Sequence, residues 1–157
     1  MINPEKISIL ERTHRLVTEY LSQYPPALAS VKPDEKAFSA VEIVCHLRDV
    51  ESLWHSRFEK LADEGEVTFV AMNPDKEAID KAYNKQTVAL ALQEWTDLRM
   101  KTYELLKTMD TTQINKTAIH PRYGAMELPR MLDIMINHDL QHLEQMKRTL
   151  SLVSQTK

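Results

Sequence analysis

The residues of this sequence with the clearest chemical potential are His138 and His142. They lie in a C-terminal segment, residues 130–157, that contains no glycine or proline and carries apolar residues at helical spacing, so we expect a helix there. Residues four apart on a helix are neighbours on one face, and two imidazoles at that spacing suit one metal ion. The same sector holds Met135 and Gln145, which indicates that the pair faces the interior.

His46 supplies a third inward imidazole. The inward side of its predicted helix also carries Ile43, Val50, Leu53, Trp54, Arg57 and Leu61. Metal sites in helical bundles are built from side chains on facing helices, and three neutral imidazoles leave at least one coordination position open. His46, His138 and His142 together therefore predict a catalytic divalent-metal site. The alternative is a metal-free bundle whose inward histidines hydrogen-bond to one another.

Two acidic residues flank His46 at one-turn spacing. Asp49 follows it and is close enough to accept a hydrogen bond from an imidazole, to hold a bound water or to be a fourth ligand, so it is the candidate catalytic residue. A solvated surface acid is the other interpretation of Asp49. Glu42 precedes His46 and completes a capping box with Ser39, so we rank it lower as a base.

The remaining histidines and the single cysteine have simpler interpretations. His14 lies on the apolar stripe of the first helix, and we favour a hydrogen-bonded core residue over one that lines the site. His55 is about half a turn from His46 around the helix axis, so we expect it to be exposed. His120 is in a loop that can reach the mouth of the site, but we favour an ordinary surface position. Cys45 points away from His46 and is expected to pack.

Arg57 and Arg99 lie at or beside the inward stripes of the second and third helices. A guanidinium in such a place either binds an anionic substrate or extends toward the surface and pairs with a carboxylate, and we favour the second. Met131, Met135 and Met146 form a row that we interpret first as core packing and second as a pliable pocket wall.

Four long helices are predicted to position these residues. The first begins at Asn3-Pro4 and ends before Pro25-Pro26, the second runs from Ser39 to about Gly65, the third from about Thr87 to Thr108, and the fourth from near Pro129 to Val153. Residues 27–38, 66–74 and 111–127 lack a helical period and are predicted as loops, with a further short helix starting at Asn73-Pro74. This arrangement predicts an all-α four-helix bundle with long connections.

Length and composition narrow the class of protein. A chain of 157 residues is expected to be one domain, residues 1–157, with a core that needs no structural staple. A net charge of −3 lacks the basic field that binds nucleic acid. One cysteine excludes an internal disulfide, no apolar run approaches the roughly 20 residues of a membrane span, and the N-terminus lacks a leader. We therefore expect a soluble cytoplasmic protein.

The chain resembles the DinB/YfiT-like superfamily. The resemblance rests on His46-Leu47-Arg48-Asp49-Val50-Glu51, on Trp95 and Arg99, on His120-Pro121-Arg122-Tyr123-Gly124, and on the stretch from His138 to Gln145. It implies a four-helix bundle in which one histidine of the second helix and two of the fourth, here His46, His138 and His142, bind nickel, zinc or iron. It also implies a homodimer. Relatives include enzymes that use bacterial low-molecular-weight thiols such as bacillithiol or mycothiol, so the resemblance implies such a thiol as a possible reactant.

Two functions follow from these observations. The first is a divalent-metal-dependent enzyme for a small-molecule substrate, either a thiol S-transferase or a related metal-assisted hydrolase, in which Asp49 orients a ligand or moves a proton. The second is a non-catalytic metal-binding module that acts in a stress response or an interaction. Both predict a divalent metal on the three histidines, and neither involves nucleic acid or a membrane.

Overall fold

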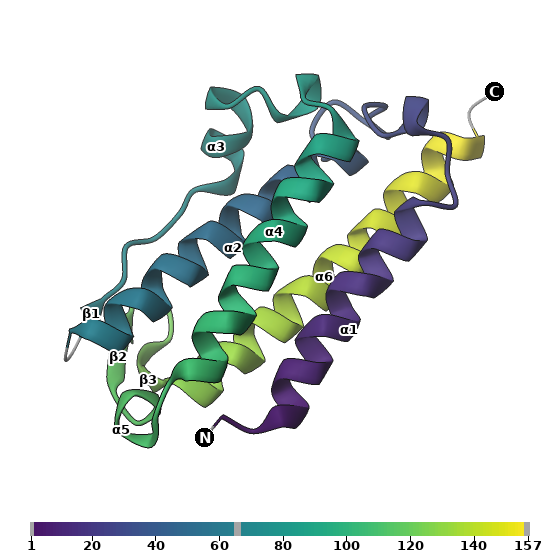
Figure 1. Ribbon diagram of the computed structural model, residues 1–157. Coiled ribbons are helices and arrows are strands. Elements are labelled where there is room, and N and C mark those ends of the chain that lie inside the picture. The colour runs from purple at the N-terminus through teal and green to yellow at the C-terminus, as the bar shows by residue number, and fades with distance from the viewer. Residues whose placement is uncertain (1, 65–66, 156–157) are drawn as a thin grey trace.

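The computed structural model describes residues 2–64 and 67–155, and four long helices make up most of it (Figure 1). They are α1 (Pro4–Leu21), α2 (Ala40–Asp63), α4 (Val88–Thr108) and α6 (Leu128–Gln155). The connections hold the short helices α3 (Pro74–Asp80) and α5 (Thr111–Ile114) and the 3-10 turns η1 (Pro26–Leu28) and η2 (Tyr83–Lys85). The predicted all-α four-helix bundle is confirmed.

Local sequence sets the first turns of the helices. The side chain of Asn3 accepts a hydrogen bond from the backbone N–H of Glu5 at 2.9 Å, and Pro4 occupies the first helical position. The capping box predicted for α2 is present: Ser39 Oγ accepts from the Glu42 N–H, and the Glu42 carboxylate accepts from the Ser39 N–H at 2.8 Å.

The other predicted boundaries agree closely with the structure. α2 ends at Asp63, while its predicted end, Gly65, and the next residue, Glu66, lie outside the described residues. α6 begins at Leu128, one residue before the predicted proline, and continues to Gln155. The short helix predicted in the second connection is α3.

The four long helices run in two directions. α1 and α6 lie side by side and run the same way, and α2 and α4 form a second pair that runs the opposite way (Figure 1). Thr149 near the end of α6 donates to the carbonyl of Phe38, just before α2, at 3.3 Å, which fixes the antiparallel match of these two helices. Because α2 and α4 are parallel, the chain must travel back along the bundle through α3 between them.

A small sheet lies at one end of the bundle, where the sequence predicted only loops. Its strands are β1 (Val67–Thr68), β2 (Thr117–His120) and β3 (Gly124–Glu127), in the order β1-β2-β3. β1 is parallel to β2, and β2 is antiparallel to β3. Gly124 begins β3 with φ of 71°, a left-handed conformation that costs little for a residue without a Cβ. The prediction of loops without secondary structure over residues 111–127 is therefore wrong.

Two apolar clusters fill the bundle. One contains Phe58 and Met131 and includes residues of the sheet, and the other contains Trp95 and Met146 and lies toward the other end. The methionine row of α6 is buried, as its packing interpretation predicted. Along α6, His138 and His142 fall between the two clusters, and on α2 His46 lies next to Leu47, the last α2 residue of the second cluster.

A buried ionic network joins the four long helices next to His138. Arg99 of α4 is 2% exposed and donates from Nε to Glu51 of α2 at 2.7 Å. Its Nη1 and Nη2 atoms donate to the two oxygens of Asp139 on α6 at 2.9 and 3.2 Å, and Thr13 of α1 donates to the same carboxylate at 2.7 Å. The favoured pairing of Arg99 with carboxylates is confirmed, but the pair is buried rather than at the surface.

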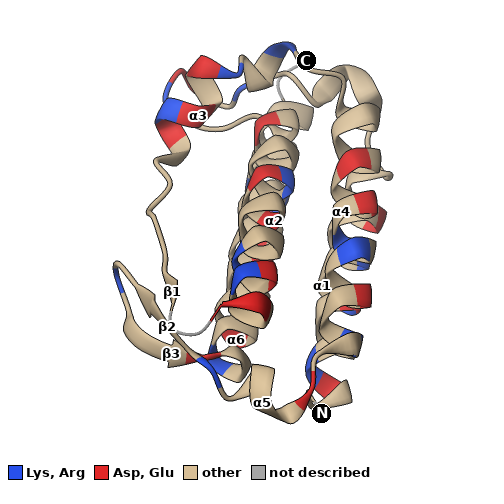
Figure 2. Cartoon of the chain, turned by 60° about the vertical axis from the view of Figure 1, so that its left-hand side comes forward, with Lys and Arg blue, Asp and Glu red and all other residues tan. Residues whose placement is uncertain are grey.

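Charged residues of both signs are mixed along the outside of the helices (Figure 2). This mixture differs from the basic stripe on one face that nucleic-acid-binding proteins present to phosphates. Within residues 2–64 and 67–155, each helix falls short of the length or the apolarity that crossing a bilayer requires.

Candidate metal centre

Three imidazole rings from two antiparallel helices meet inside the bundle. His46 comes from α2, and His138 and His142 come from successive turns of α6. Nε2 of His138 lies 3.1 Å from Nε2 of His46 and 3.1 Å from Nε2 of His142. The three candidate ligand atoms all lie within 4.8 Å of one another. The structure thus brings together the three histidines that were predicted from the sequence as metal ligands.

Two of the separations between these nitrogens, those that involve His138, match the separations between ligands of one ion. For a metal–nitrogen bond of about 2.05 Å, two nitrogens on a tetrahedral ion are about 3.3 Å apart, and two adjacent nitrogens on an octahedral ion are about 2.9 Å apart. The observed separation of 3.1 Å lies between these values. His46 and His142 are therefore each spaced from His138 as two ligands of one ion are.

Gln145 sets the hydrogen position on His142. The amide oxygen of Gln145 lies 2.7 Å from Nδ1 of His142, and because that oxygen only accepts, Nδ1 carries the hydrogen and Nε2 turns a lone pair toward the centre. The single Nε2 of His138 then faces two other Nε2 atoms but can donate only one hydrogen, so hydrogen bonds alone do not satisfy the group. A cation at the centre resolves this mismatch. The bond to Gln145 is of the kind that orients metal-ligating imidazoles.

Burial favours the neutral form, which binds metals, in all three rings. Burial, followed by the charge of the neighbouring rings, lowers the pKa of His46 to about 3. Burial, then His142 and Arg99, lower the pKa of His138 to about 3. Burial also lowers the pKa of His142. An unprotonated imidazole can donate its lone pair to a cation, so the electrostatics of the site fit a metal.

Asp49 lies beside this group but outside it. Its Oδ1 accepts from Nε of Arg48 at 2.8 Å, and its Oδ2 accepts from the hydroxyl of Tyr83 at 2.5 Å and from Nζ of Lys81 at 2.8 Å. These bonds tie α2 to the connection after α3. Within the described part of the chain, neither oxygen hydrogen-bonds to an imidazole. The structure therefore does not give Asp49 the ligating or hydrogen-bonded position beside His46 that the sequence predicted.

Two further histidines lie away from the centre. His14 is half-buried, with Nε2 3.2 Å from Oγ1 of Thr96 and its ring edge-on to Trp95 at a centroid distance of 4.4 Å. His14 is therefore a hydrogen-bonded packing residue, which is the interpretation that we favoured from the sequence. The prediction that His55 is exposed is wrong: its side chain is 19% exposed, and Nδ1 lies 3.4 Å from Oγ1 of Thr102. The cause is α4, which covers that side of α2.

Cys45 and Glu42 have structural surroundings. Cys45 is buried with Sγ 3.5 Å from Oε1 of Gln86, and burial raises the pKa of the thiol to about 11. The interpretation of Cys45 as a packing residue holds. The Glu42 carboxylate caps α2 and lies 3.0 Å from Nζ of Lys32, so it is already engaged away from the imidazoles.

A cavity of about 460 Å³ opens beside the histidine centre. Its wall consists of His46, Val50, Leu53, Trp54, Arg57, Ala71, Met72, Pro74, His120, Pro121, Arg122, Tyr123, Ile134 and His138. The volume lies in the range of small-molecule sites, and the mixture of apolar and cationic side chains is of the kind that fixes a ligand's orientation. Two of the three candidate metal ligands therefore face a space that a substrate can occupy.

His120 belongs to this wall, so the favoured surface position is wrong. It ends β2, is half-buried, and its ring centroid lies 4.8 Å from that of Tyr123 and 6.3 Å from that of Trp54. Its Nδ1 accepts from the backbone N–H of Arg122 at 3.1 Å. The sheet that sequence analysis missed carries His120 there. The available signal was Gly124 between two short apolar runs, a pattern typical of a hairpin.

Arg57 also lies in surroundings that differ from those predicted. Its side chain is almost entirely buried, and Nη2 donates to the carbonyl of Val70 at 2.8 Å. The guanidinium carbon lies 4.8 Å from the ring centroid of Trp54 and 4.5 Å from that of Phe69. Among the described residues, no carboxylate pairs with it. The favoured pairing of Arg57 with a carboxylate is therefore not observed.

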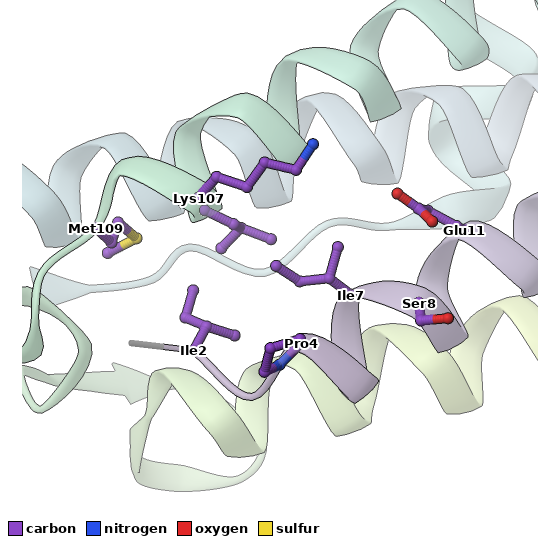
Figure 3. Close-up of a pocket in the computed structure, with 8 residues that line it drawn as sticks. Ile2, Pro4, Ile7, Ser8, Glu11, Lys107 and Met109 are labelled. Atoms are coloured by element: carbon purple, nitrogen blue, oxygen red, sulfur yellow. The ribbon is translucent and has the colours of Figure 1, made fainter.

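A second cavity, of about 300 Å³, lies between the start of α1 and the end of α4 (Figure 3). Figure 3 shows Ile2 and Ile7 extending into it, and its wall also includes Glu11 and Lys107. None of the three histidines lines this cavity. Of these two cavities, the one beside the histidines is therefore the better candidate for a site of chemistry.

Solved structures of similar fold place this architecture among known bundles. YfiT from Bacillus subtilis, described as a probable metal-dependent hydrolase with an unusual four-helix bundle topology, superposes with a TM-score of 0.84 at 15% identity, over 96% of this chain and 87% of that one. TT2238, a four-helix bundle protein, gives 0.68 at 18% identity, over 93% and 98%. The mycothiol-dependent maleylpyruvate isomerase gives 0.76 at 8% identity, over 98% of this chain and 66% of that one.

Sequence comparison identifies the family. No curated protein sequence matches the chain significantly. A profile of the family described as the DinB superfamily matches residues 9–146, a range that includes all three histidines of the centre and most of the four long helices. The resemblance inferred from the histidine motifs is thereby confirmed. The chain belongs to the DinB superfamily.

Proposed function

We propose that this protein is a divalent-metal-dependent enzyme for a small-molecule substrate, with His46, His138 and His142 holding nickel, zinc or iron. The observation that carries the proposal is the meeting of three imidazole Nε2 atoms beside a cavity of about 460 Å³. Three protein ligands leave coordination positions free for a reactant, as in catalytic sites. Imidazole suits several first-row metals, so the three ions are proposed together.

The reaction class that we propose is thiol S-transfer, or a related hydrolysis. A divalent ion at this centre supplies Lewis acidity and makes water or a thiol nucleophilic near neutral pH. The fold neighbours include a mycothiol-dependent isomerase and a probable metal-dependent hydrolase, which supports a thiol such as mycothiol or bacillithiol as one reactant. Trp54 and Ile134 on the cavity wall would keep bulk water from the other reactant.

The chain's own groups have distinct tasks in this proposal. Gln145 keeps the lone pair of His142 directed at the centre. Asp49 acts as a positioning residue: it anchors the connection that carries Lys81 and Tyr83 to α2, one turn from His46, and its negative charge favours a cation nearby. We further propose a homodimer, on the strength of the DinB-like resemblance, with light scattering of the purified protein as the test. A cytoplasmic location stays a prediction from the sequence.

The test is a reconstitution and activity screen on untagged protein. Bacillithiol and mycothiol are offered with an epoxide or a chloro-nitro-aromatic electrophile, and esters are offered with water alone. We expect turnover that requires a divalent ion and disappears in His142→Ala while the circular dichroism spectrum stays helical. Metal binding without turnover of any thiol or ester would instead favour a non-catalytic metal-binding module.

A further inference from the structure

The buried arginines of this protein differ in how their charge is balanced. Arg99 contacts the carboxylates of Glu51 and Asp139, and the partly buried Arg48 contacts those of Asp49 and Glu94. Arg57 is the exception within residues 2–64 and 67–155: its side chain is 6% exposed, and no carboxylate lies within ion-pairing distance. A buried guanidinium without a counter-ion is costly, and an anion that binds from outside would offset part of that cost.

The hydrogen bonds of Arg57 are also incomplete. A guanidinium has five N–H groups, and the described residues accept one bond, from Nη2 to the carbonyl of Val70. Nε is buried without a partner. The guanidinium carbon lies 4.8 Å from the ring centroid of Trp54 and 4.5 Å from that of Phe69, so both rings contact the cation and favour this position for it. Arg57 therefore offers oriented, unsatisfied donors at the cavity wall.

The cavity around Arg57 has a one-sided charge. Its wall contains Arg57 and Arg122 and includes no aspartate or glutamate, although the whole chain carries a net charge of −3. His120 lies on the same wall, and burial, then the charges of Arg57 and Arg122, lower its pKa. A cavity with such a wall should favour a ligand that carries a negative charge.

The distance between Arg57 and the histidine centre determines how long a ligand must be to contact both. Arg57 follows His46 by eleven residues on α2, which returns it to nearly the same side of the helix about 16 Å further along the axis. Val50 and Trp54 lie between them on the wall of the same cavity. A ligand that touches both ends must therefore be elongated, with an apolar body between its anionic end and its reacting end.

We infer that Arg57 binds the carboxylate of an elongated, partly apolar organic acid, the substrate whose other end reaches His46, His138 and His142. Carboxylate is the preferred anion because its planar, bidentate geometry matches the planar fork of the guanidinium N–H groups. This assignment rests on the proposed function for its reacting end. The binding of the acid by Arg57 is a separate property of the cavity.

The test is equilibrium binding of 4-phenylbutyrate, its neutral amide and inorganic phosphate, measured by ligand-observed NMR on the full chain as purified and after removal of metal. We expect the acid to bind roughly ten- to hundredfold more tightly than the amide, the range given by one charged hydrogen-bond pair. The preference should vanish in Arg57→Met, persist in part in Arg57→Lys, and be unchanged in Arg15→Met, a matched change at an exposed arginine on α1.

Several results would overturn the inference. Equal binding of acid and amide would do so, as would a preference that survives in Arg57→Met, which would place the carboxylate elsewhere, for instance on the metal. Phosphate binding as tight as that of the acid would refute the choice of carboxylate. A preference that persists without metal, in a protein that never binds metal, would refute the proposed function but leave the acid site standing. Metal-dependent turnover without a preference for the acid over the amide would refute the acid site and leave the proposed function standing.

Discussion

At the scale of single residues, the neutral imidazoles of the centre are the feature from which function follows. His46 and His142 come from different helices and are brought to the same Nε2 atom of His138. Their identity and approximate position were predictable, because helical periodicity alone places each on an inward face. The hydrogen bond from His142 to Gln145 was less accessible, since Gln145 was identified only as a residue of the same sector.

Gln145→Leu tests that hydrogen bond. Loss of the amide oxygen frees the ring of His142 to turn and removes the partner that fixes its hydrogen, so we expect metal affinity to fall roughly 10- to 100-fold. Competition with a chromophoric chelator measures the change. Gln141→Leu, at an exposed position one turn away, is the control. Equal affinities for the two variants would show that Gln145 does not support the centre.

His14 predicts a pH effect that is independent of metal. Burial, then the charge of Arg99, lower its pKa to about 4, from 6.5 in an unfolded chain, with Asp139 acting in the opposite direction. Between these values the unfolded state binds more protons, so the contribution of neutral His14 to stability is present above pH 6.5 and lost as pH falls toward 4. In His14→Gln, the free energy of unfolding in urea should therefore fall less steeply over this interval. Parallel curves for the variant and the natural protein would contradict this assignment.

At the scale of elements, the buried network around Arg99 explains how α6 is held with His138 toward α2. Arg99 contacts α2 through Glu51 and α6 through Asp139, and Thr13 adds α1. The sequence predicted a carboxylate partner for Arg99 but not its burial, because pairing across three helices is not encoded in the period of one. The sheet was missed for a similar reason: its strands are two to four residues long, and Val67 pairs with the distant Ala118.

Arg99→Met and Arg57→Met should separate the two kinds of buried arginine. Removing Arg99 leaves Glu51 and Asp139 buried without a cation, so we expect a loss of about 3–5 kcal/mol in the free energy of unfolding. Removing Arg57 strands no carboxylate, and its buried ring contacts are worth about 2 kcal/mol. Urea denaturation of both variants measures the difference. A cost for Arg57→Met as large as that for Arg99→Met would mean that Arg57 is retained chiefly for stability.

At the scale of the whole molecule, the four long helices hold the three imidazoles, and the small sheet, which was not predicted, supplies part of the cavity wall. The parallel direction of α2 and α4 requires a long return, and that return, together with the β2–β3 hairpin, supplies Met72, His120 and Tyr123 to the cavity wall. Periodicity predicted the frame and its three inward imidazoles. It did not predict the cavity, because the wall is assembled from segments whose approach depends on tertiary structure alone.

The central claim is that one divalent ion binds to the three converging imidazoles, and elemental analysis tests it most directly. Untagged protein, reconstituted with nickel, zinc or iron and then freed of excess metal, should retain about one equivalent of metal, and His46→Ala and His142→Ala should retain almost none. His55→Ala, on the same helix as His46 but outside the centre, should retain as much as the natural protein. Less than about a tenth of an equivalent in the natural protein, or equal retention in all variants, would contradict the account.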